Sequence, residues 1–188
     1  MASGNLYDGF GSMIRTEHLF YAVIYEYNPR RGDELRVRFL DEVQVIREIP
    51  GHDMWECSSQ TGNIRGYVPV ECLTPTFLHE SFYRNCDRQE TEELMRSAPV
   101  GTYLIRPSGR TMFALSLKTA LGIKNYGIKH AKGMNGGFHI DGDYKKFNTL
   151  QDLIASFRKN RDGMATDLLY PIGELRREPV SWRPFNFV

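Results

Sequence analysis

GTYLIRPS, residues 101–108, is the most informative stretch of this chain. Its apolar residues favour a β-strand, and Pro107 prevents that strand from continuing in the middle of a sheet. Arg106 therefore stands at the end of an apolar strand, where a guanidinium is costly to bury unless an anion meets it. Its planar fork suits two-point contact with a carboxylate or a phosphate. On these residues alone, a phosphate ligand and a structural pair with a buried Asp or Glu are both open.

The residues around this stretch predict an α+β domain over 81–172. Asp87 is a candidate helix N-cap with Glu90 three residues later, and Leu94 and Met95 are expected to face the core. Thr149 is placed to cap a second helix, in which apolar residues recur on one face. The expected helices are 87–96 and 150–159, and the expected strands are 102–106, 112–118, 124–129 and 138–141. Two helices flanking an antiparallel sheet make an α+β sandwich.

The preceding residues, 19–75, predict a small all-β domain. Short runs of strand-favouring residues alternate there with breaks such as Gly32 and the stretch 61–63, a pattern typical of an antiparallel β-barrel. The expected strands are 20–25, 35–39, 42–46, 55–58 and 66–70. We expect a flexible leader at 1–18, a short junction at 76–80 and a C-terminal tail at 173–188.

Composition excludes several classes of function. The 188 residues allow one or two small domains, and a net charge of +1 gives no support for nucleic-acid binding driven by bulk charge. The three cysteines are odd in number and lack zinc-ligand spacing, which favours a reduced, cytoplasmic chain. No apolar run is long enough for an integral membrane segment, and Ala2 stands where N-myristoylation requires glycine. No metal, cofactor or catalytic motif is expected, so we expect no enzymatic activity.

Four short motifs in the first domain occur in the order found in SH3 domains. They are 22–27 (AVIYEY), 33–35 (DEL), Trp55 and 66–69 (GYVP). This part of the chain therefore resembles an SH3 domain, which binds proline-rich proteins by laying an extended proline-rich segment across an aromatic-lined groove. The resemblance implies the following groove residues: Tyr25, Tyr27, Asp33, Glu34, Trp55, Pro69 and Cys72.

Cys72 departs from the family pattern, because SH3 domains usually have an aromatic residue there. A thiol offers neither the area nor the hydroxyl of a tyrosine, and Glu71 adds a charge beside it. We therefore expect weak binding of ordinary proline-rich peptides. The alternative is that Tyr25 and Trp55 are only half-buried residues of the barrel, which then serves as a packing partner for the second domain.

The second domain resembles an SH2 domain over its whole length. The matching motifs include 101–106 (GTYLIR), 126–128 (YGI), 136–138 (GGF), 147–150 (FNTL) and 168–171 (LLYP). The resemblance implies phosphotyrosine recognition, with a phosphate carrying about −1.5 to −2 charges at Arg106. The implied phosphotyrosine-binding residues are Arg106, Arg88, Ser108, Arg110, Thr111 and Asn125, and Tyr126 and Tyr144 would contact the residues that follow the phosphotyrosine. Asn125 and Gly127 stand where the family commonly has a histidine and a lysine, so we expect affinity to depend more on Arg88 and Arg110.

The order SH3 then SH2 resembles the Src-like adaptor proteins and the regulatory half of Src- and Abl-type cytoplasmic tyrosine kinases. Residues 173–188 contain no glycine-rich loop and no HRD or DFG motif. The very short junction, and the cysteine where the groove of the barrel usually has a tyrosine, favour a non-enzymatic adaptor in the cytoplasm, recruited to membranes by tyrosine-phosphorylated receptors or scaffolds. The alternative is the regulatory fragment of a kinase.

Overall fold

The computed structural model describes residues 20–49, 51–133 and 136–175. These residues form two separate five-stranded sheets, one from strands between residues 20 and 75 and one from strands between residues 102 and 171. The expected leader and nearly all of the expected tail lie outside the described residues. None of the helices in the described ranges has the length and apolar character needed to span a membrane.

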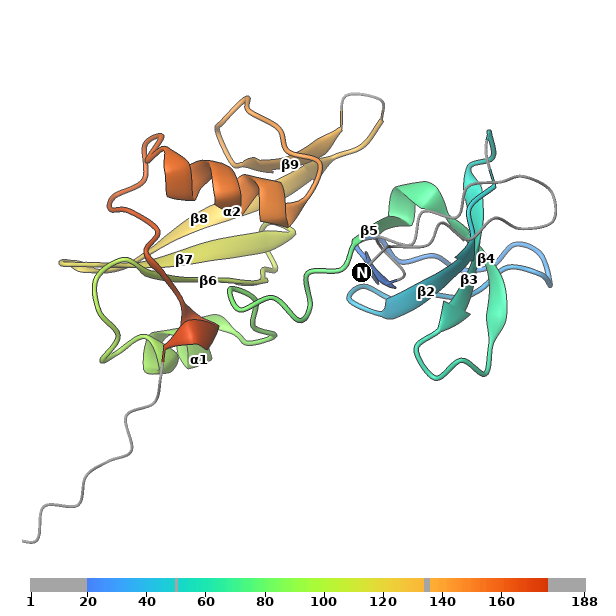
Figure 1. The fold of residues 1–188 in the computed structure, drawn as a ribbon, viewed down its shortest axis with the longest axis horizontal. Helices are drawn as coiled ribbons and strands as arrows, with labels where there is room; N and C mark the ends of the chain where they lie inside the picture. Colours follow the sequence, from blue (N-terminus) through green and yellow to red (C-terminus); the bar gives the residue numbers. More distant parts are fainter. Residues whose placement is uncertain (1–19, 50, 134–135, 176–188) are drawn as a thin grey trace, which may run out of the picture. The chain divides into compact units, whose positions relative to one another are not determined.

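The N-terminal sheet has the strand order β4-β3-β2-β1-β5, with every neighbouring pair antiparallel (Figure 1). Its elements are β1 (Phe20–Val23), β2 (Glu42–Arg47), β3 (Met54–Ser59), β4 (Arg65–Pro69), the 3₁₀ helix η1 (Val70–Cys72) and β5 (Leu73–Pro75). Four of the five expected strands are confirmed to within a few residues. The antiparallel all-β character expected for this part of the chain is therefore confirmed.

The expected strand at 35–39 is wrong. Leu35 and Val37 are both buried, so apolar and polar residues alternate along this stretch as they would in a strand. The stretch nevertheless forms only isolated β-bridges to two different partners and no continuous ladder. Val37 pairs with Tyr27, and Glu34 pairs with Tyr67. β5 was not expected, because Pro75 argues against a strand. The sheet accommodates Pro75 because β5 lies at its edge and pairs with β1 alone.

The core of the N-terminal sheet contains two of the three cysteines. Its buried members are Tyr21, Val23, Leu35, Val37, Val43, Val45, Cys57, Val68 and Cys72. Burial raises the pKa of the Cys57 thiol to about 12, with a smaller contribution from the charge of Glu56. Burial also raises the pKa of Cys72. Both thiols are therefore protonated at neutral pH and act as small apolar core residues.

We expect Cys57 and Cys72 to resist alkylation in the folded protein. Only the thiolate reacts, and both groups are buried and protonated, so they should react slower than an exposed thiol by about two orders of magnitude or more. Cys86, which is partly exposed, should react first. Mass spectrometry after iodoacetamide treatment should show one modified cysteine without denaturant and three with it. Equal rates at all three sites would contradict this core.

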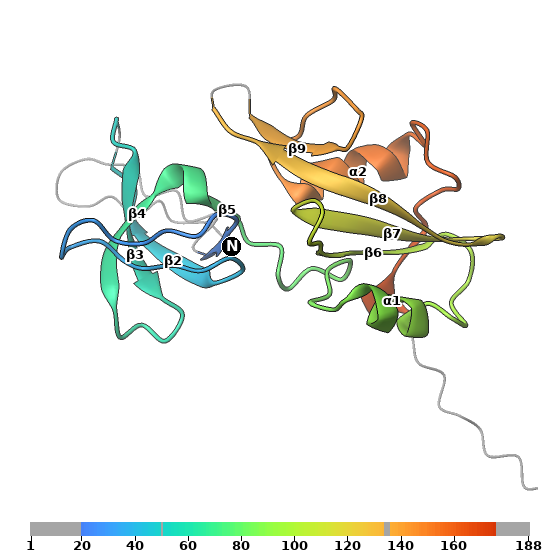
Figure 2. The same cartoon turned by 180° about the vertical axis from the view of Figure 1, so that it is seen from behind.

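The C-terminal sheet has the strand order β10-β6-β7-β8-β9. Its elements are α1 (Arg88–Leu94), β6 (Thr102–Pro107), β7 (Phe113–Thr119), β8 (Gly122–Ala131), β9 (Gly137–Ile140), α2 (Leu150–Lys159), β10 (Tyr170–Pro171) and the 3₁₀ helix η2 (Ile172–Glu174). β6 pairs antiparallel with β7 and parallel with β10. The two helices cover opposite faces of this sheet, as the two opposite views show (Figures 1 and 2). The expected α+β sandwich is confirmed.

Both predicted helix caps are present. The Asp87 side chain accepts a hydrogen bond from the Glu90 backbone N–H, and the Glu90 carboxylate accepts one from the Asp87 N–H, which completes a capping box. Thr149 Oγ1 accepts a hydrogen bond from the Asp152 N–H in the same way. The inward orientation expected of Leu94 is wrong: its side chain is 41% exposed, whereas its neighbour Met95 is fully buried.

Candidate functional site

Arg106 lies near the end of β6 and is 7% exposed. On one edge of the strand it stands opposite Ala114 of β7. On the other edge, the Ile105 N–H donates to the Phe82 carbonyl and the Ile105 carbonyl accepts from the Arg84 N–H. The backbone that carries Arg106 is therefore held from both sides, which fixes the point from which its side chain extends.

The guanidinium of Arg106 has more donors than the protein uses. Nη1 donates to the Pro107 carbonyl at 3.1 Å and Nη2 donates to Asn125 Oδ1 at 3.3 Å, whereas Nε is buried without a hydrogen-bond partner. None of the ion pairs between described residues involves Arg106. Within the described ranges, the alternative of a structural pair with a buried carboxylate is therefore excluded. Of five N–H donors, two are used by the protein and one is buried at Nε, so the second N–H groups of Nη1 and Nη2 remain for an external anion.

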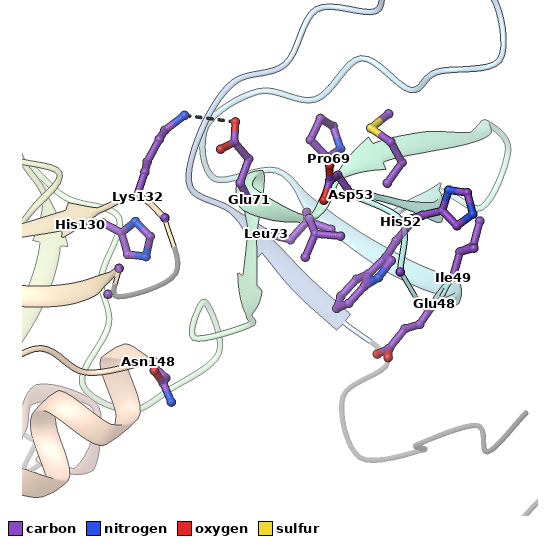
Figure 3. Close-up of a pocket in the computed structure, with 17 residues that line it drawn as sticks. Glu48, Ile49, His52, Asp53, Pro69, Glu71, Leu73, His130, Lys132 and Asn148 are labelled. Carbon is purple, nitrogen blue, oxygen red and sulfur yellow. Dashed lines mark hydrogen bonds and ion pairs between the residues drawn. The ribbon is translucent and has the colours of Figure 1, made fainter.

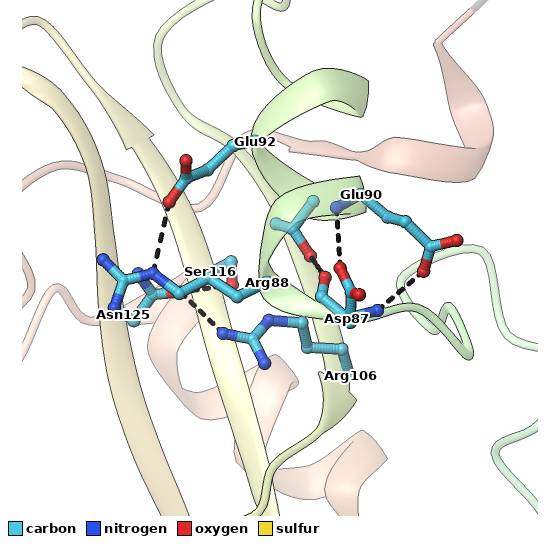
Figure 4. A network of polar contacts seen from close by, with 8 residues as sticks. Asp87, Arg88, Glu90, Glu92, Arg106, Ser116 and Asn125 are labelled. Atoms are coloured by element: carbon cyan, nitrogen blue, oxygen red, sulfur yellow. Dashed lines mark hydrogen bonds and ion pairs between the residues drawn. The ribbon is translucent and has the colours of Figure 1, made fainter.

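Asn125 of β8 holds this guanidinium and is itself held by Ser116 of β7 (Figure 4). Asn125 Oδ1 accepts from the Ser116 hydroxyl at 2.6 Å and from Arg106 at 3.3 Å. The amide group therefore orients the arginine without neutralising it. The prediction named Asn125 but missed Ser116, which had no local signal because its role depends on a partner on the next strand.

The loop after β6 is closed by its own hydroxyl groups. Thr111 Oγ1 donates to the Phe113 carbonyl at 2.7 Å and lies 3.3 Å from Ser108 Oγ, which also accepts from the Thr111 N–H at 3.5 Å. Arg110 is exposed in the same loop. Ser108, Arg110 and Thr111 therefore lie on one short loop directly after Arg106.

Arg88 is the first residue of α1 and forms an ion pair one turn along the helix. Its Nε donates to Glu92 Oε1 at 3.2 Å, and the two side chains are 73% and 55% exposed. Figure 4 shows both side chains extending from α1 toward the side on which Arg106 and Asn125 lie. Glu92 was not among the predicted site residues, although its spacing of four residues from Arg88 was the available signal.

The two predicted specificity residues differ in their surroundings. The Tyr126 hydroxyl accepts a hydrogen bond from the Ala165 N–H at 2.8 Å, which ties β8 to the loop after α2. Arg161 strengthens that loop by donating to the carbonyls of Met164 and Ala165. Tyr144 is 97% exposed. Tyr126 therefore lies against the loop after α2, whereas Tyr144 extends into solvent.

In the N-terminal sheet, Glu34 organises its own loop. Its Oε2 accepts from the Tyr27 hydroxyl at 2.6 Å and from the backbone N–H groups of Arg30 at 2.6 Å and Arg31 at 3.2 Å. The hydrogen bond from Tyr27 is the main reason that the pKa of Glu34 lies below its usual value. Of the two predicted carboxylates, Asp33 is exposed, whereas the Glu34 carboxylate already accepts three hydrogen bonds within the protein.

The remaining residues predicted for the groove differ in how deeply they are buried. Trp55 and Pro69 come from the paired strands β3 and β4 and belong to the part of a hollow's lining that residues 20–75 provide, together with residues labelled in Figure 3 such as Glu48 and His52. Tyr25, Tyr27 and Trp55 are partly buried against the core. Cys72 is 3% exposed and belongs to the core itself, so the position predicted for it, in the wall of a surface groove, is wrong. η1 turns this side chain inward.

Comparison with known families agrees with the geometry around Arg106. Residues 82–157 match the model of the SH2 domain family. The match contains the buried arginine, the strand that carries Asn125 and the helix that carries Arg88. SH2 domains recognise phosphotyrosine in signalling, and a buried arginine with free donors suits its phosphate. Residues 82–157 are an SH2 domain.

Proposed function

We propose that this chain is a non-enzymatic signalling adaptor whose SH2 domain binds tyrosine-phosphorylated receptors or scaffolds. The observation that carries the proposal is the buried guanidinium of Arg106, which has free donors and no carboxylate partner among the described residues. A phosphate carrying about −1.5 to −2 charges at pH 7 supplies the missing counter-charge. Phosphoserine is too short to reach an arginine at the end of a buried strand, so the site selects phosphotyrosine.

The other residues of the site act around that contact. Arg106 binds the phosphate by two N–H groups, and the hydroxyls of Ser108 and Thr111 turn from each other toward the phosphate oxygens. Arg88 and Arg110 add charge from the helix and from the loop. Tyr126 and the loop it holds contact the residues after the phosphotyrosine. Recruitment to membranes follows from the phosphorylated partner.

A titration tests this function directly. A fluorescent peptide should bind the purified chain when its tyrosine is phosphorylated, and should bind at least about a hundredfold more weakly when it is not. The phosphoserine version should behave like the unphosphorylated peptide. Equal binding of all three peptides would remove the proposal, and transfer or removal of phosphate by the purified chain would contradict a non-enzymatic role.

Asn125→Ala should weaken phosphotyrosine binding moderately. The substitution removes the group that orients Arg106 and leaves the Ser116 hydroxyl without its acceptor. We expect a loss of about 1 kcal/mol, the usual contribution of one hydrogen bond. The same titration measures it, with Lys124→Ala, an exposed neighbour on β8, as the control. An unchanged affinity would show that Asn125 does not position the arginine.

For the N-terminal sheet we propose an SH3 domain that binds proline-rich segments weakly. The support is the set of half-buried aromatic residues packed on its core, including Tyr25, Tyr27 and Trp55. An SH3 domain followed by an SH2 domain suits the proposed adaptor and equally its alternative, a regulatory fragment of a tyrosine kinase. The mass of the native protein in cell extract separates the two: about 22 kDa supports the adaptor, and a species carrying a kinase domain supports the alternative.

Trp55→Ala should abolish any binding of proline-rich peptides to this sheet. The indole packs edge-on against Tyr21, with ring centroids 5.4 Å apart, and lines the hollow with Pro69. Its removal takes away the largest aromatic surface there, whereas binding of the phosphotyrosine peptide should not change. We expect a binding free energy of about −5 kcal/mol or weaker, and NMR titration detects binding in this range. Shifts that persist in Trp55→Ala would place the peptide elsewhere.

A further inference from the structure

The ion pair between Arg88 and Glu92 is placed unfavourably for the helix that carries it. A cation at the first residue of a helix and an anion near its last residue both oppose the helix dipole. The order is also the weaker one for pairs spaced four residues apart, in which an acidic residue before a basic one is preferred. Arg88 and Glu92 have both features, in a helix that spans Arg88–Leu94. Helix stability therefore does not explain this pair.

The surroundings of the pair suggest a different role. Arg88 Nε is occupied by the Glu92 carboxylate at 3.2 Å, on the side of the sheet where Arg106 has free donors (Figure 4). A phosphate bound at Arg106 and approached by Arg88 would meet the negative charge of Glu92 close by. The phosphate would also compete with that carboxylate for the same guanidinium.

We propose that Glu92 is a positioning residue that holds Arg88 in the empty site and thereby lowers the affinity for phosphotyrosine. The inference rests on the proposed function and adds its regulation: a ligand must share Arg88 with the Glu92 carboxylate or displace it. The carboxylate repels a doubly charged phosphate more than a singly charged anion. Glu92 therefore lowers the affinity most for the most highly charged ligand.

Glu92→Gln tests the proposal because glutamine keeps the length of the side chain and its hydrogen-bonding capacity but removes the charge. We expect this variant to bind a phosphotyrosine peptide about three- to tenfold more tightly than the unmodified chain at low salt, and the gain to shrink as salt increases. Glu93→Gln is the matched control, because Glu93 is the next residue of α1, equally acidic and exposed. It should leave the affinity nearly unchanged.

Two further measurements separate this role from a structural one. In an Arg88→Ala background, Glu92→Gln should give a gain smaller than in the unmodified chain, because the carboxylate has lost the guanidinium through which it acts. A sulfotyrosine peptide, with one negative charge, should gain about half as much as the phosphotyrosine peptide on a logarithmic scale. A structural effect of the substitution would not depend on ligand charge.

The inference is overturned if Glu92→Gln binds the phosphotyrosine peptide no more tightly than Glu93→Gln. It is also overturned if the gain is the same with and without Arg88. Failure of the proposed function is distinct, because the unmodified chain would then show no preference for the phosphorylated peptide in the first place. Thermal unfolding of each variant shows whether α1 is intact.

Discussion

Arg106→Ala should reduce the affinity for a phosphotyrosine peptide by roughly 2–5 kcal/mol, about one and a half to three and a half orders of magnitude. The substitution removes the buried counter-charge for the phosphate, and the exposed cations Arg88 and Arg110 do not replace it. Arg106→Lys should also lose most of the affinity, because a single ammonium cannot make the two-point contact. Calorimetric titration of both variants measures the loss.

The folding stability of the same variants provides the control. Arg106 is a buried cation with no ion pair within the described ranges and with an Nε that has no partner, so alanine removes two hydrogen bonds together with the cost of burying that charge. We expect thermal unfolding of Arg106→Ala at or above the temperature of the unmodified chain. A variant that loses binding because it unfolds would contradict this account, and so would near-normal affinity in either variant.

Gly66→Ala should destabilise the N-terminal sheet by about 1–3 kcal/mol or more. A Cβ at this position would lie 2.8 Å from the Leu35 nitrogen and 2.9 Å from the Asp33 carbonyl oxygen, both backbone atoms that cannot rotate away. The loop must then move off β4, which breaks the hydrogen bonds between Leu35 N–H and the Tyr67 carbonyl and between Tyr67 N–H and the Asp33 carbonyl. Urea unfolding measures the loss.

Gly32→Ala is the matched control, since a Cβ at that position meets no atom within 4 Å. Amide hydrogen exchange should accelerate at Leu35 and Tyr67 in Gly66→Ala and stay unchanged in Gly32→Ala. Normal protection of these amides in Gly66→Ala would mean that the loop does not lie against β4.

Local chemistry made much of the C-terminal sheet predictable. Asp87 with Glu90, and Thr149 before an apolar helix face, signal helix starts through contacts between residues close in sequence. Arg106 stood out because a cation at the end of an apolar strand needs an explanation. These signals need no knowledge of the rest of the fold.

The errors arose where long-range pairing decides the structure. Leu35 and Val37 alternate like strand residues, yet their stretch bridges to Tyr27 on one side and, through Glu34, to Tyr67 on the other. β5 and β10 are too short for periodicity to detect, and each contains a proline that only an edge position accepts. No local pattern indicates such positions.

In the candidate site, too, the features set by local sequence were predictable and those set by long-range pairing were not. Arg88, Arg106 and the loop after β6 were identifiable from motifs, whereas the contact of Ser116 with Asn125 depends on how two strands align. Cys72 was misplaced because a family motif puts a position in a groove without stating which way η1 turns the side chain. Motifs therefore indicated the residues of the candidate site, and the structure supplied the contacts among them.

The central claim is that the unpaired donors of Arg106 bind the phosphate, and the NMR signals of its guanidinium N–H groups, Nη and Nε, test this most directly. Without ligand, Nε–H has no acceptor, and Nη1 and Nη2 each donate to one protein oxygen. Addition of a phosphotyrosine peptide should shift and sharpen the guanidinium resonances of Arg106 and slow their exchange with water, whereas the unphosphorylated peptide should leave them unchanged. If the phosphorylated peptide binds and shifts other resonances while every guanidinium resonance of Arg106 stays as it was, the phosphate does not bind at Arg106 and the account is wrong.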